Sequence, residues 1–285
     1  MPSMQSWEHR VAIVTGGAGG IGLAIARAIV AGGGSVVVGD LHEERGRAAA
    51  DELGAGGRVR FVSVDVAEES DVEALVTAAV DTFGHVDAMF NNAGVGGALG
   101  PIVEQTVEAW DATFAINVRS VFLGTKHAAR RMIEQGTGGA IVNTASIAGL
   151  SGGGGPQAYS AAKAAVIGFT RATASELAEH RNRVNAVCPG AIYTDLLHRG
   201  RPEQTDVWRE ELQPWPDRGE PEMIADVAVW LAGDEARFVT GEAVTADGGL
   251  MAAAPRLVDH DLPHLRRLSG MTYGTTGRAP EVRRI

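Results

Sequence analysis

Short runs of apolar residues alternate along the chain with longer segments in which apolar residues recur every three or four positions. Most of the short runs are continuously apolar, as in parallel strands that are covered on both faces. The longer segments have the period of helices that bury one side. The predicted strands are Val11–Thr15, Ser35–Gly39, Val59–Val64, Val86–Asn91, Ala140–Thr144, Val184–Val187 and Ala243–Ala246. The predicted helices are Ile21–Ala31, Glu43–Leu53, Glu69–Phe83, Val107–Glu134, Gln157–Glu179 and Glu222–Leu231.

This regular alternation predicts an α/β fold, with a parallel sheet and right-handed crossovers. No linker divides residues 1–250, so one domain is expected there, followed by a C-terminal extension, 251–285. The segment 195–221 contains tryptophans and prolines without clear periodicity. It is interpreted as a substrate-binding loop or lid, or alternatively as a long surface excursion. The basic extension either docks on an acidic body or is a loosely held terminus.

The composition narrows the class of protein. Of 285 residues, 45% are hydrophobic and 21% are charged, which is typical of soluble globular proteins. No apolar run approaches the roughly 18 residues that span a bilayer, and no apolar signal core is recognisable. The single cysteine, Cys188, excludes an internal disulfide, and a cytoplasmic location is expected. A net charge of −10 argues against non-specific binding of nucleic acid.

A glycine-rich segment, Thr15–Gly22, follows the first predicted strand and opens the first predicted helix. Glycines allow close backbone approach, and the helix N-terminus offers free N–H groups to a pyrophosphate, so this segment predicts dinucleotide binding. Asp40 stands at the end of the second strand, 18 residues after Gly22. A carboxylate there suits ribose hydroxyls and repels a 2′-phosphate. Since no Lys or Arg lies in the glycine loop or directly after Asp40, NAD is favoured over NADP.

A second constellation combines a tyrosine, a lysine and a serine. The chain has two lysines, Lys126 and Lys163, and Lys163 lies four residues after Tyr159. On a helix this spacing puts the ammonium and the phenol on one face. Ser146 precedes Tyr159 by 13 positions. A phenol titrates near pH 10, so acid–base work near pH 7 needs its pKa lowered by about 3 units, which nearby cations in a desolvated cleft can supply.

Taken together, these residues resemble the short-chain dehydrogenase/reductase family over roughly residues 8–250. The resemblance rests on the glycine loop together with Asp65-Val66, Asn91–Gly94, Asn117, Ser146, Tyr159-x3-Lys163 and Pro189-Gly190-x3-Thr194. It implies a single Rossmann-type, doubly wound domain. Its seven-stranded parallel sheet is expected in the order 3-2-1-4-5-6-7, with helices on both faces.

The resemblance also implies roles for individual residues. The catalytic residues are expected to be Asn117, Ser146, Tyr159 and Lys163, with Tyr159 as the general acid/base, Lys163 lowering its pKa, Ser146 orienting the substrate oxygen and Asn117 anchoring a water. The expected cofactor-binding residues are Gly16, Gly19, Gly20, Ile21, Gly22, Asp40, Leu41, Asp65, Val66, Asn92, Ala93, Gly94, Tyr159, Lys163, Pro189, Gly190, Ile192 and Thr194. The expected substrate contacts are Ser146, Leu150, Trp208 and Trp215. No metal is required.

The function expected from these residues is an NAD-dependent oxidoreductase that interconverts a secondary alcohol and its ketone. A bulky, cyclic, apolar substrate is favoured by resemblance to one branch of the family. Two alternatives remain open: a 3-oxoacyl thioester reductase, against which Asp40 argues because that role usually goes with NADPH, and a non-catalytic dinucleotide-binding scaffold. The family resemblance also implies a homo-oligomer, a tetramer, with no nucleic-acid or membrane partner.

Overall fold

Parallel strands form the centre of the protein, and the described part of the chain contains seven of them in one sheet of order β3-β2-β1-β4-β5-β6-β7. The structure is a computed structural model that describes residues 6–54, 56–198 and 213–253. The described residues up to Leu250 form one compact unit. The strands are β1 (Val11–Thr15), β2 (Ser35–Asp40), β3 (Val59–Ser63), β4 (Ala88–Asn91), β5 (Gly139–Thr144), β6 (Asn182–Pro189) and β7 (Ala243–Ala246).

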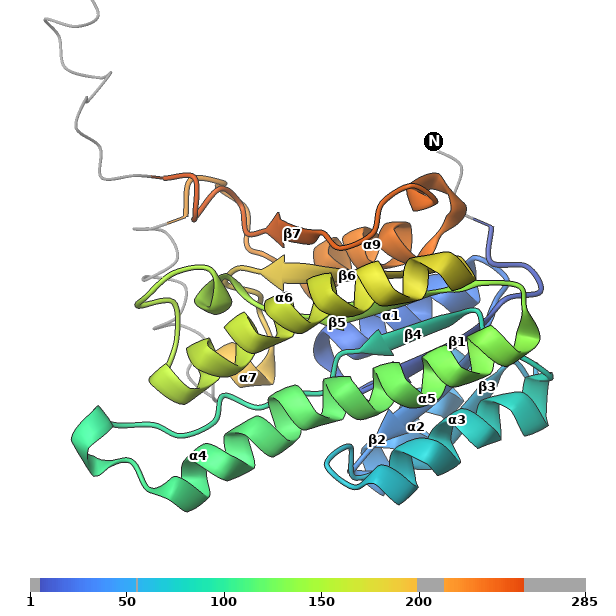
Figure 1. The fold of residues 1–285 in the computed structure, drawn as a ribbon, viewed down its shortest axis with the longest axis horizontal. Helices are drawn as coiled ribbons and strands as arrows, with labels where there is room; N and C mark the ends of the chain where they lie inside the picture. Colours follow the sequence, from blue (N-terminus) through green and yellow to red (C-terminus); the bar gives the residue numbers. More distant parts are fainter. Residues whose placement is uncertain (1–5, 55, 199–212, 254–285) are drawn as a thin grey trace, which may run out of the picture. The chain divides into compact units, whose positions relative to one another are not determined.

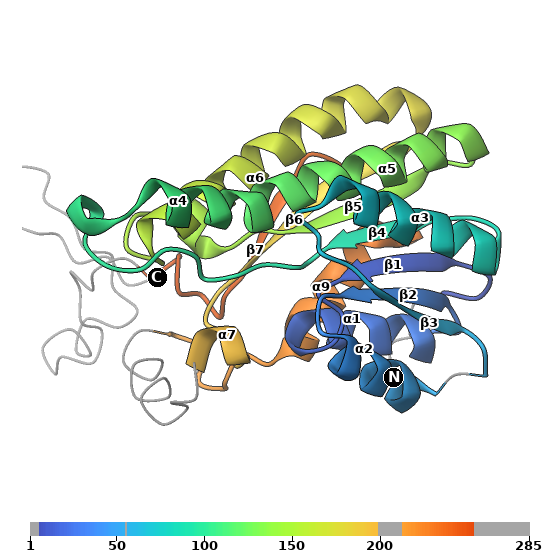
Figure 2. The same ribbon diagram turned by 90° about the horizontal axis from the view of Figure 1, so that it is seen from below.

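Helices cover both faces of this sheet. Figure 1 shows the strand–helix alternation, and Figure 2 shows α3, α5 and α6 on one face with α1, α2 and α9 on the other. The α-helices are α1 (Gly20–Ala31), α2 (Glu43–Leu53), α3 (Glu69–Phe83), α4 (Val107–Phe114), α5 (Ser120–Gln135), α6 (Gln157–Leu177), α7 (Asp195–His198) and α9 (Pro221–Ala232). Short helical turns are η1 (Ile102–Glu104), η3 (Ile147–Gly149), η4 (Ala178–His180) and η5 (Asp234–Ala236). The predicted doubly wound fold and strand order are confirmed.

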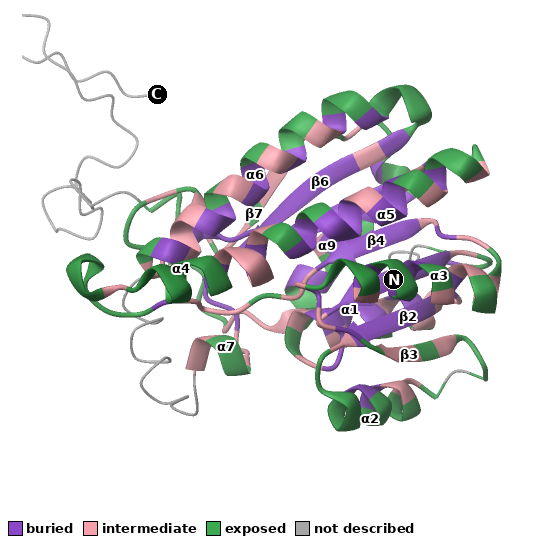
Figure 3. Ribbon diagram, turned by 60° about the horizontal axis from the view of Figure 1, so that its bottom comes forward, coloured by how far each residue is buried: buried purple, intermediate pink, exposed green. Residues whose placement is uncertain are grey.

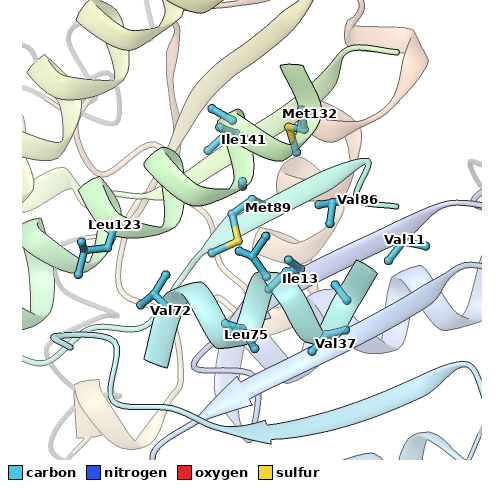
Figure 4. Close-up of a cluster of buried hydrophobic side chains, with 14 of the residues drawn as sticks. Val11, Ile13, Val37, Val72, Leu75, Val86, Met89, Leu123, Met132 and Ile141 are labelled. Atoms are coloured by element: carbon cyan, nitrogen blue, oxygen red, sulfur yellow. The ribbon is translucent and has the colours of Figure 1, made fainter. Parts of the chain in front are cut away.

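The apolar strand residues alternate between two cores, one on each face of the sheet. On one side Ile13 and Met89 pack with Leu75 of α3 and Leu123 of α5, as Figure 4 shows. On the other side Val14 and Phe90 pack with residues of α1 and α9. The strands β1, β2, β4, β5 and β6 are therefore largely buried on both faces (Figure 3), which explains their continuous apolar runs. The edge strands β3 and β7 are only partly buried.

The helices end where the sequence supplies suitable capping residues. Gly84 ends α3 with φ of 90°, and its N–H donates to the carbonyl of Val80. A left-handed residue at this position is nearly free of strain only when it is glycine. At the other end of a helix, the Thr106 side chain accepts a hydrogen bond from the N–H of Ala109 and so caps α4.

One helix differs from its prediction. The expected continuous helix Val107–Glu134 is interrupted by a π-helical turn, η2 (Ala115–Arg119), between α4 and α5. At its centre the Asn117 amide donates to the carbonyl of Thr113, four residues earlier, and also to that of Val95. These bonds account for the widened turn, because a side chain inserted among the backbone groups displaces the ordinary ladder. Other boundaries shift by one or two residues.

Among the described residues, the structure contains no helix that is long and apolar enough to cross a membrane. The same residues contain no group of three or more His, Cys, Asp or Glu side chains placed to hold a metal ion.

Candidate active site

A pocket of about 1380 Å³ opens at the carboxyl ends of the strands, where β1 lies between β2 and β4. The strand order reverses direction at this point, and ligands of open α/β sheets bind in the crevice that results. Segments from the whole described domain contribute to the lining, from Gly16 to Pro221.

The glycine loop forms one wall, and its glycines are required by close packing. A Cβ on Gly22 would lie 2.2 Å from the carbonyl oxygen of Gly16, and a Cβ on Gly16 would lie 2.9 Å from the Cα of Ala93. Gly19 precedes α1 and provides no side-chain cap. The N–H groups of the first turn of α1 therefore meet no capping side chain, which suits an anionic group such as a pyrophosphate.

Thr15 and Asn92 join the loop to the end of β4. The Thr15 hydroxyl accepts hydrogen bonds from the N–H groups of Asn92 (3.0 Å) and Ala93 (3.2 Å). The Asn92 amide donates to the carbonyls of Thr15 (3.1 Å) and Gly16 (3.3 Å). These reciprocal bonds fix the small residues Ala93 and Gly94 against the loop, where they leave room for a bulky ligand.

Asp40 holds the same loop from the β2 side. One carboxylate oxygen accepts from the N–H of Ala18 at 3.1 Å, and the other accepts from the N–H of His42 at 3.0 Å. Each oxygen keeps a further lone pair, so the carboxylate retains the capacity to accept hydrogen bonds from ribose hydroxyls. Asp40 and Leu41 line the pocket, as do Asp65 and Val66 beyond the end of β3.

The serine, tyrosine and lysine meet at the opposite wall. Ser146 follows β5, while Tyr159 and Lys163 lie one turn apart on α6. The Ser146 side chain lies beside the Tyr159 phenol and acts to lower its pKa. The Lys163 ammonium donates to the carbonyl of Thr144 at 2.7 Å and lies 5.5 Å from the centroid of the Tyr159 ring. Three side chains suited to acid–base chemistry thus share one end of the pocket.

Burial dominates the electrostatics of this trio. Burial raises the pKa of Tyr159, and the neighbouring Ser146 side chain only partly opposes it. Burial also lowers the pKa of Lys163 to about 8. The lowered phenol pKa expected from the sequence is therefore not produced by the protein's own groups, because desolvation of the buried phenol outweighs them.

Asn117 lies behind Lys163 and not in the pocket lining. It is fully buried, and its side-chain oxygen accepts from the N–H of Val95 at 3.2 Å. A Cβ on Gly94 would lie 2.9 Å from that oxygen and 3.4 Å from the Lys163 nitrogen. Glycine at position 94 therefore lets the asparagine and the lysine approach the same point.

Beyond β6 the chain returns to the glycine loop. A Cβ on Gly20 would lie 3.2 Å from the methyl carbon of Thr194, so these two segments lie side by side. Gly190 is equally constrained, since a Cβ there would lie 2.7 Å from the Cα of Asp247. Pro189, Gly190, Ile192 and Thr194 all line the pocket.

The structure brings nearly all the predicted cofactor residues together. Gly22 alone among them does not line the pocket, because it packs behind the loop. Two of the predicted substrate contacts, Leu150 and Trp215, do not line the pocket: Leu150 follows η3 and is exposed, and Trp215 is 56% exposed. Their contact with substrate stays a prediction. Trp208 lies outside the described residues.

Several lining residues escaped the sequence analysis. Backbone of Gly153, Gly154 and Gly155 lines the pocket between Ser146 and Tyr159, and the run of four consecutive glycines from residue 152 was the sequence feature that could have indicated it.

Arg45, in the first turn of α2, also lines the pocket. Its guanidinium would lie 2.8 Å from a Cβ on Gly19. A cation therefore stands beside the glycine loop, although none lies within the loop or next to Asp40 in sequence.

The residues present fit a dinucleotide. The glycines leave backbone room at the helix N-terminus, a carboxylate stands at the end of β2, and a buried lysine faces a tyrosine at the far end. A side chain at Gly16 or Gly22 would clash with Ala93 or with the Gly16 carbonyl, and would therefore distort the loop that such a ligand contacts.

Comparisons with known proteins agree with this geometry. A family model described as enoyl-(acyl carrier protein) reductase matches residues 16–251. The chain is 40% identical over 251 residues to 2,5-dichloro-2,5-cyclohexadiene-1,4-diol dehydrogenase of Sphingobium indicum, covering 87% of this chain and 100% of that protein. It is also 40% identical over 251 residues to (+)-borneol dehydrogenase 2 of Salvia officinalis, covering 84% and 88% respectively.

A solved structure has the same fold. The crystal structure of levodione reductase superposes with a TM-score of 0.82 at 37% identity, covering 87% of this chain and 100% of that one. With the family model, the relatives and the strand order in agreement, the chain belongs to the short-chain dehydrogenase/reductase family, whose oxidoreductases bind nicotinamide dinucleotides.

Proposed function

We propose that the protein is an NAD-dependent dehydrogenase that interconverts a secondary alcohol and its ketone. The observation that carries the proposal is the grouping of Ser146 and Tyr159 beside the buried Lys163 at one end of the pocket. This trio shares one pocket with the glycine loop and Asp40, so a ligand bound at the loop extends toward the acid–base residues.

The nicotinamide ring, when bound, accepts or supplies the hydride and brings a positive charge in its oxidised form. Ser146 holds the substrate oxygen by a hydrogen bond, and the Tyr159 phenolate removes the proton of the hydroxyl group. Two electrons and a proton leave the carbinol carbon as hydride, and the C–O bond becomes a carbonyl. In the reverse direction the neutral phenol returns its proton to the oxygen.

Lys163 stabilises the phenolate in this scheme. Its ammonium lies 5.5 Å from the Tyr159 ring and is held in place by the Thr144 carbonyl. Because burial raises the pKa of Tyr159, the lowering needed for catalysis requires additional positive charge next to the phenol. Asn117 accepts one hydrogen bond from Val95 at its side-chain oxygen, which leaves a lone pair for a water that connects Lys163 to solvent.

The preference for NAD over NADP rests on Asp40. Its carboxylate lines the pocket beside the glycine loop and would repel a 2′-phosphate while accepting hydrogen bonds from ribose hydroxyls. Arg45 is the one nearby cation on α2, and its ion pair with Asp195 reduces its availability for a phosphate.

For the substrate we propose a bulky, cyclic, apolar alcohol. The glycine wall at residues 153–155 places no side chain between Ser146 and Tyr159, which leaves width for a ring. Two relatives are named for ring alcohols, a cyclohexadiene-diol and borneol. The rival candidate, a thioester reductase, takes support from the description of the matching family model. A purely binding scaffold is disfavoured, since binding of a dinucleotide does not require a tyrosine beside a serine that is placed to orient a substrate oxygen.

The test is a screen for NADH formation over cyclic, acyclic and aromatic secondary alcohols, with an acyl thioester reduction measured in parallel. Cyclic alcohols are expected to give the highest kcat/KM, and Tyr159→Phe should lower kcat by a hundredfold or more, about the usual contribution of a general acid/base. NADH binding by the variant should stay nearly unchanged, since only a hydroxyl is removed. Turnover by Tyr159→Phe at the wild-type rate would contradict the mechanism, and preference for the thioester would favour the rival.

We also propose a homotetramer in the cytoplasm. Trp110 and Phe122 are exposed on α4 and α5, and Phe122 touches Phe169 of α6, so these helices present an apolar surface. Such a surface suits burial against a second copy of the chain. Light scattering on the purified protein should give four times the chain mass, and a monomer would contradict the proposal. Cell fractionation tests the location.

A further inference from the structure

Arg45 and Asp195 face each other at the rim of the pocket. Arg45 lies in the first turn of α2, directly after the β2 end that carries Asp40, whereas Asp195 opens α7 after β6. The guanidinium nitrogen Nη2 lies 3.6 Å from a carboxylate oxygen of Asp195. Both residues line the pocket, so this ion pair joins two walls that are far apart in sequence.

The Arg45 guanidinium also lies against the glycine loop. Its Nη2 atom would be 2.8 Å from a Cβ on Gly19, so the absence of a side chain at position 19 makes room for the cation. On the Asp195 side, the preceding residue Thr194 lies against Gly20. The two partners therefore flank the two glycines that precede and begin α1, where the sequence and the packing place an anionic part of the ligand.

This pair contributes little to folding. The side chains are 56% and 79% exposed, and exposed ion pairs have little effect on the free energy of unfolding. A comparable pair on the same helix, Arg47 with Glu43, spans a single turn of α2, and neither residue lines the pocket. What distinguishes Arg45 and Asp195 is their position, because their ion pair bridges the two sides of the ligand cleft.

We propose that Arg45 and Asp195 form a clasp that closes the rim of the dinucleotide site beside the glycine loop and slows release of the cofactor. The inference rests on the proposed dinucleotide-binding function and adds two residues that retain the ligand. Release requires the pair to separate, so the strength of the ion pair enters the dissociation rate. Asp195 also lies 3.5 Å from His198, a contact that stays within α7.

The experiment measures NADH dissociation from the full-length protein by stopped-flow fluorescence, with excess NAD⁺ to displace bound NADH. The proteins are wild type, Arg45→Ala, Asp195→Ala, the double variant and Arg47→Ala as the matched control. Each of the two single variants should release NADH about two- to fivefold faster, in line with the strength of an exposed pair. The double variant should be no faster than either single variant, and Arg47→Ala should behave as wild type.

The double-variant cycle separates the clasp from other roles of the two side chains. Asp195→Ala removes the contact with His198 in the wild-type protein and in the Arg45→Ala protein alike. This loss therefore cancels in the coupling energy between Arg45 and Asp195. High salt should bring the wild-type rate toward that of Arg45→Ala, since exposed ion pairs are screened.

Three results would overturn the clasp. If both single variants release NADH at the wild-type rate, the ion pair does not retain the cofactor. Multiplicative effects in the double variant show that the residues act independently. Faster release for Arg45→Ala alone, with Asp195→Ala unchanged or slower, shows that Arg45 binds the cofactor directly. Failure of the wild-type protein to bind NADH at all would instead contradict the proposed function.

Discussion

Replacing Lys163 by methionine should change how the stability of the protein depends on pH. Lys163 is only 3% exposed, and burial lowers its pKa from an ordinary value of 10.5 to about 8. Each pKa unit corresponds to about 1.4 kcal/mol, so the charged ammonium costs the folded state about 3 kcal/mol at pH 7. The chain keeps a cation in a desolvated position where an apolar side chain would be less costly.

The sign of the pH dependence follows from proton binding. Below pH 8 Lys163 is charged in both the folded and the unfolded chain, and the folded chain carries the full penalty. Between about pH 8 and 10.5 the folded chain has a neutral Lys163 while the unfolded chain is still charged. The unfolded chain then binds more protons, so the free energy of unfolding rises with pH. Integration from pH 7 to about pH 9.5 gives a gain of about 2 kcal/mol.

Urea unfolding followed by tryptophan fluorescence measures this gain, at one protein concentration and without cofactor. The wild-type free energy of unfolding, relative to that of Lys163→Met, should rise by about 2 kcal/mol between pH 7 and about pH 9.5. The hydrogen bond to the Thr144 carbonyl is missing from the variant at both pH values, so it affects the difference little. Burial raises the pKa of Cys188 to about 11, and Lys163 acts to lower it, so loss of Lys163 can only raise it further. The folded thiol therefore stays protonated up to about pH 9.5 in both proteins, and its contribution cancels.

The chain offers a matched control in Lys126, its other lysine, which forms an exposed ion pair with Glu69. Lys126→Met removes an ammonium at the surface and should not reproduce the pH-dependent difference. If the wild-type and Lys163→Met proteins differ by the same amount at both pH values, the ammonium is not destabilised by burial and the reasoning is refuted.

Two further predictions concern the pocket walls. Asp40→Ala should lower the ratio of kcat/KM for NAD over that for NADP by about tenfold or more, because hydrogen bonds to the ribose hydroxyls and repulsion of a 2′-phosphate are both lost. The variant also loses the hydrogen bond that the N–H of Ala18 donates, so the glycine loop should loosen. An unchanged ratio in initial-rate assays would contradict the role of Asp40. Gly155→Ala puts a Cβ 3.0 Å from the Tyr159 ring, so kcat should fall about tenfold while NADH affinity, measured by fluorescence titration, changes little. Gly152→Ala, which meets no atom within 4 Å, is the control, and equal kcat values for both variants would argue against the contact.

Much of the fold could be predicted because its central strands are buried on both faces. Val36, Val37 and Val38 are completely buried in β2, so their apolar run carries the signal directly. The strand order was predicted from the family resemblance, because local hydrophobic patterns do not show which strands pair with each other. The π-helical turn could not be predicted, because it depends on hydrogen bonds between Asn117 and Val95, two residues that only the folded chain brings together.

Some residues of the candidate site could likewise be predicted from the sequence, and others could not. Residues tied to local geometry, such as Gly16 and Asp40, were recognisable from spacing after a strand. Arg45 was not, because its approach to Gly19 depends on how α2 docks on the sheet. That docking is set by Gly46, where a Cβ would lie 1.9 Å from the Phe61 ring. Tertiary packing of this kind leaves no periodic signal in the sequence.

The strand order has a consequence for synthesis of the protein. β1 pairs with β4, and the far half of the pocket is supplied by segments after β5 and β6. A nascent chain that has reached α3 already contains the glycine loop and Asp40, yet it lacks Tyr159, Lys163 and the segment that ends at Thr194. Its β1 edge also stays unpaired until β4 emerges, which leaves apolar surface open to chaperones and to aggregation. Acquisition of tight NADH binding should therefore mark near-completion of the chain, and a ribosome-bound series of increasing length would locate the point at which it appears.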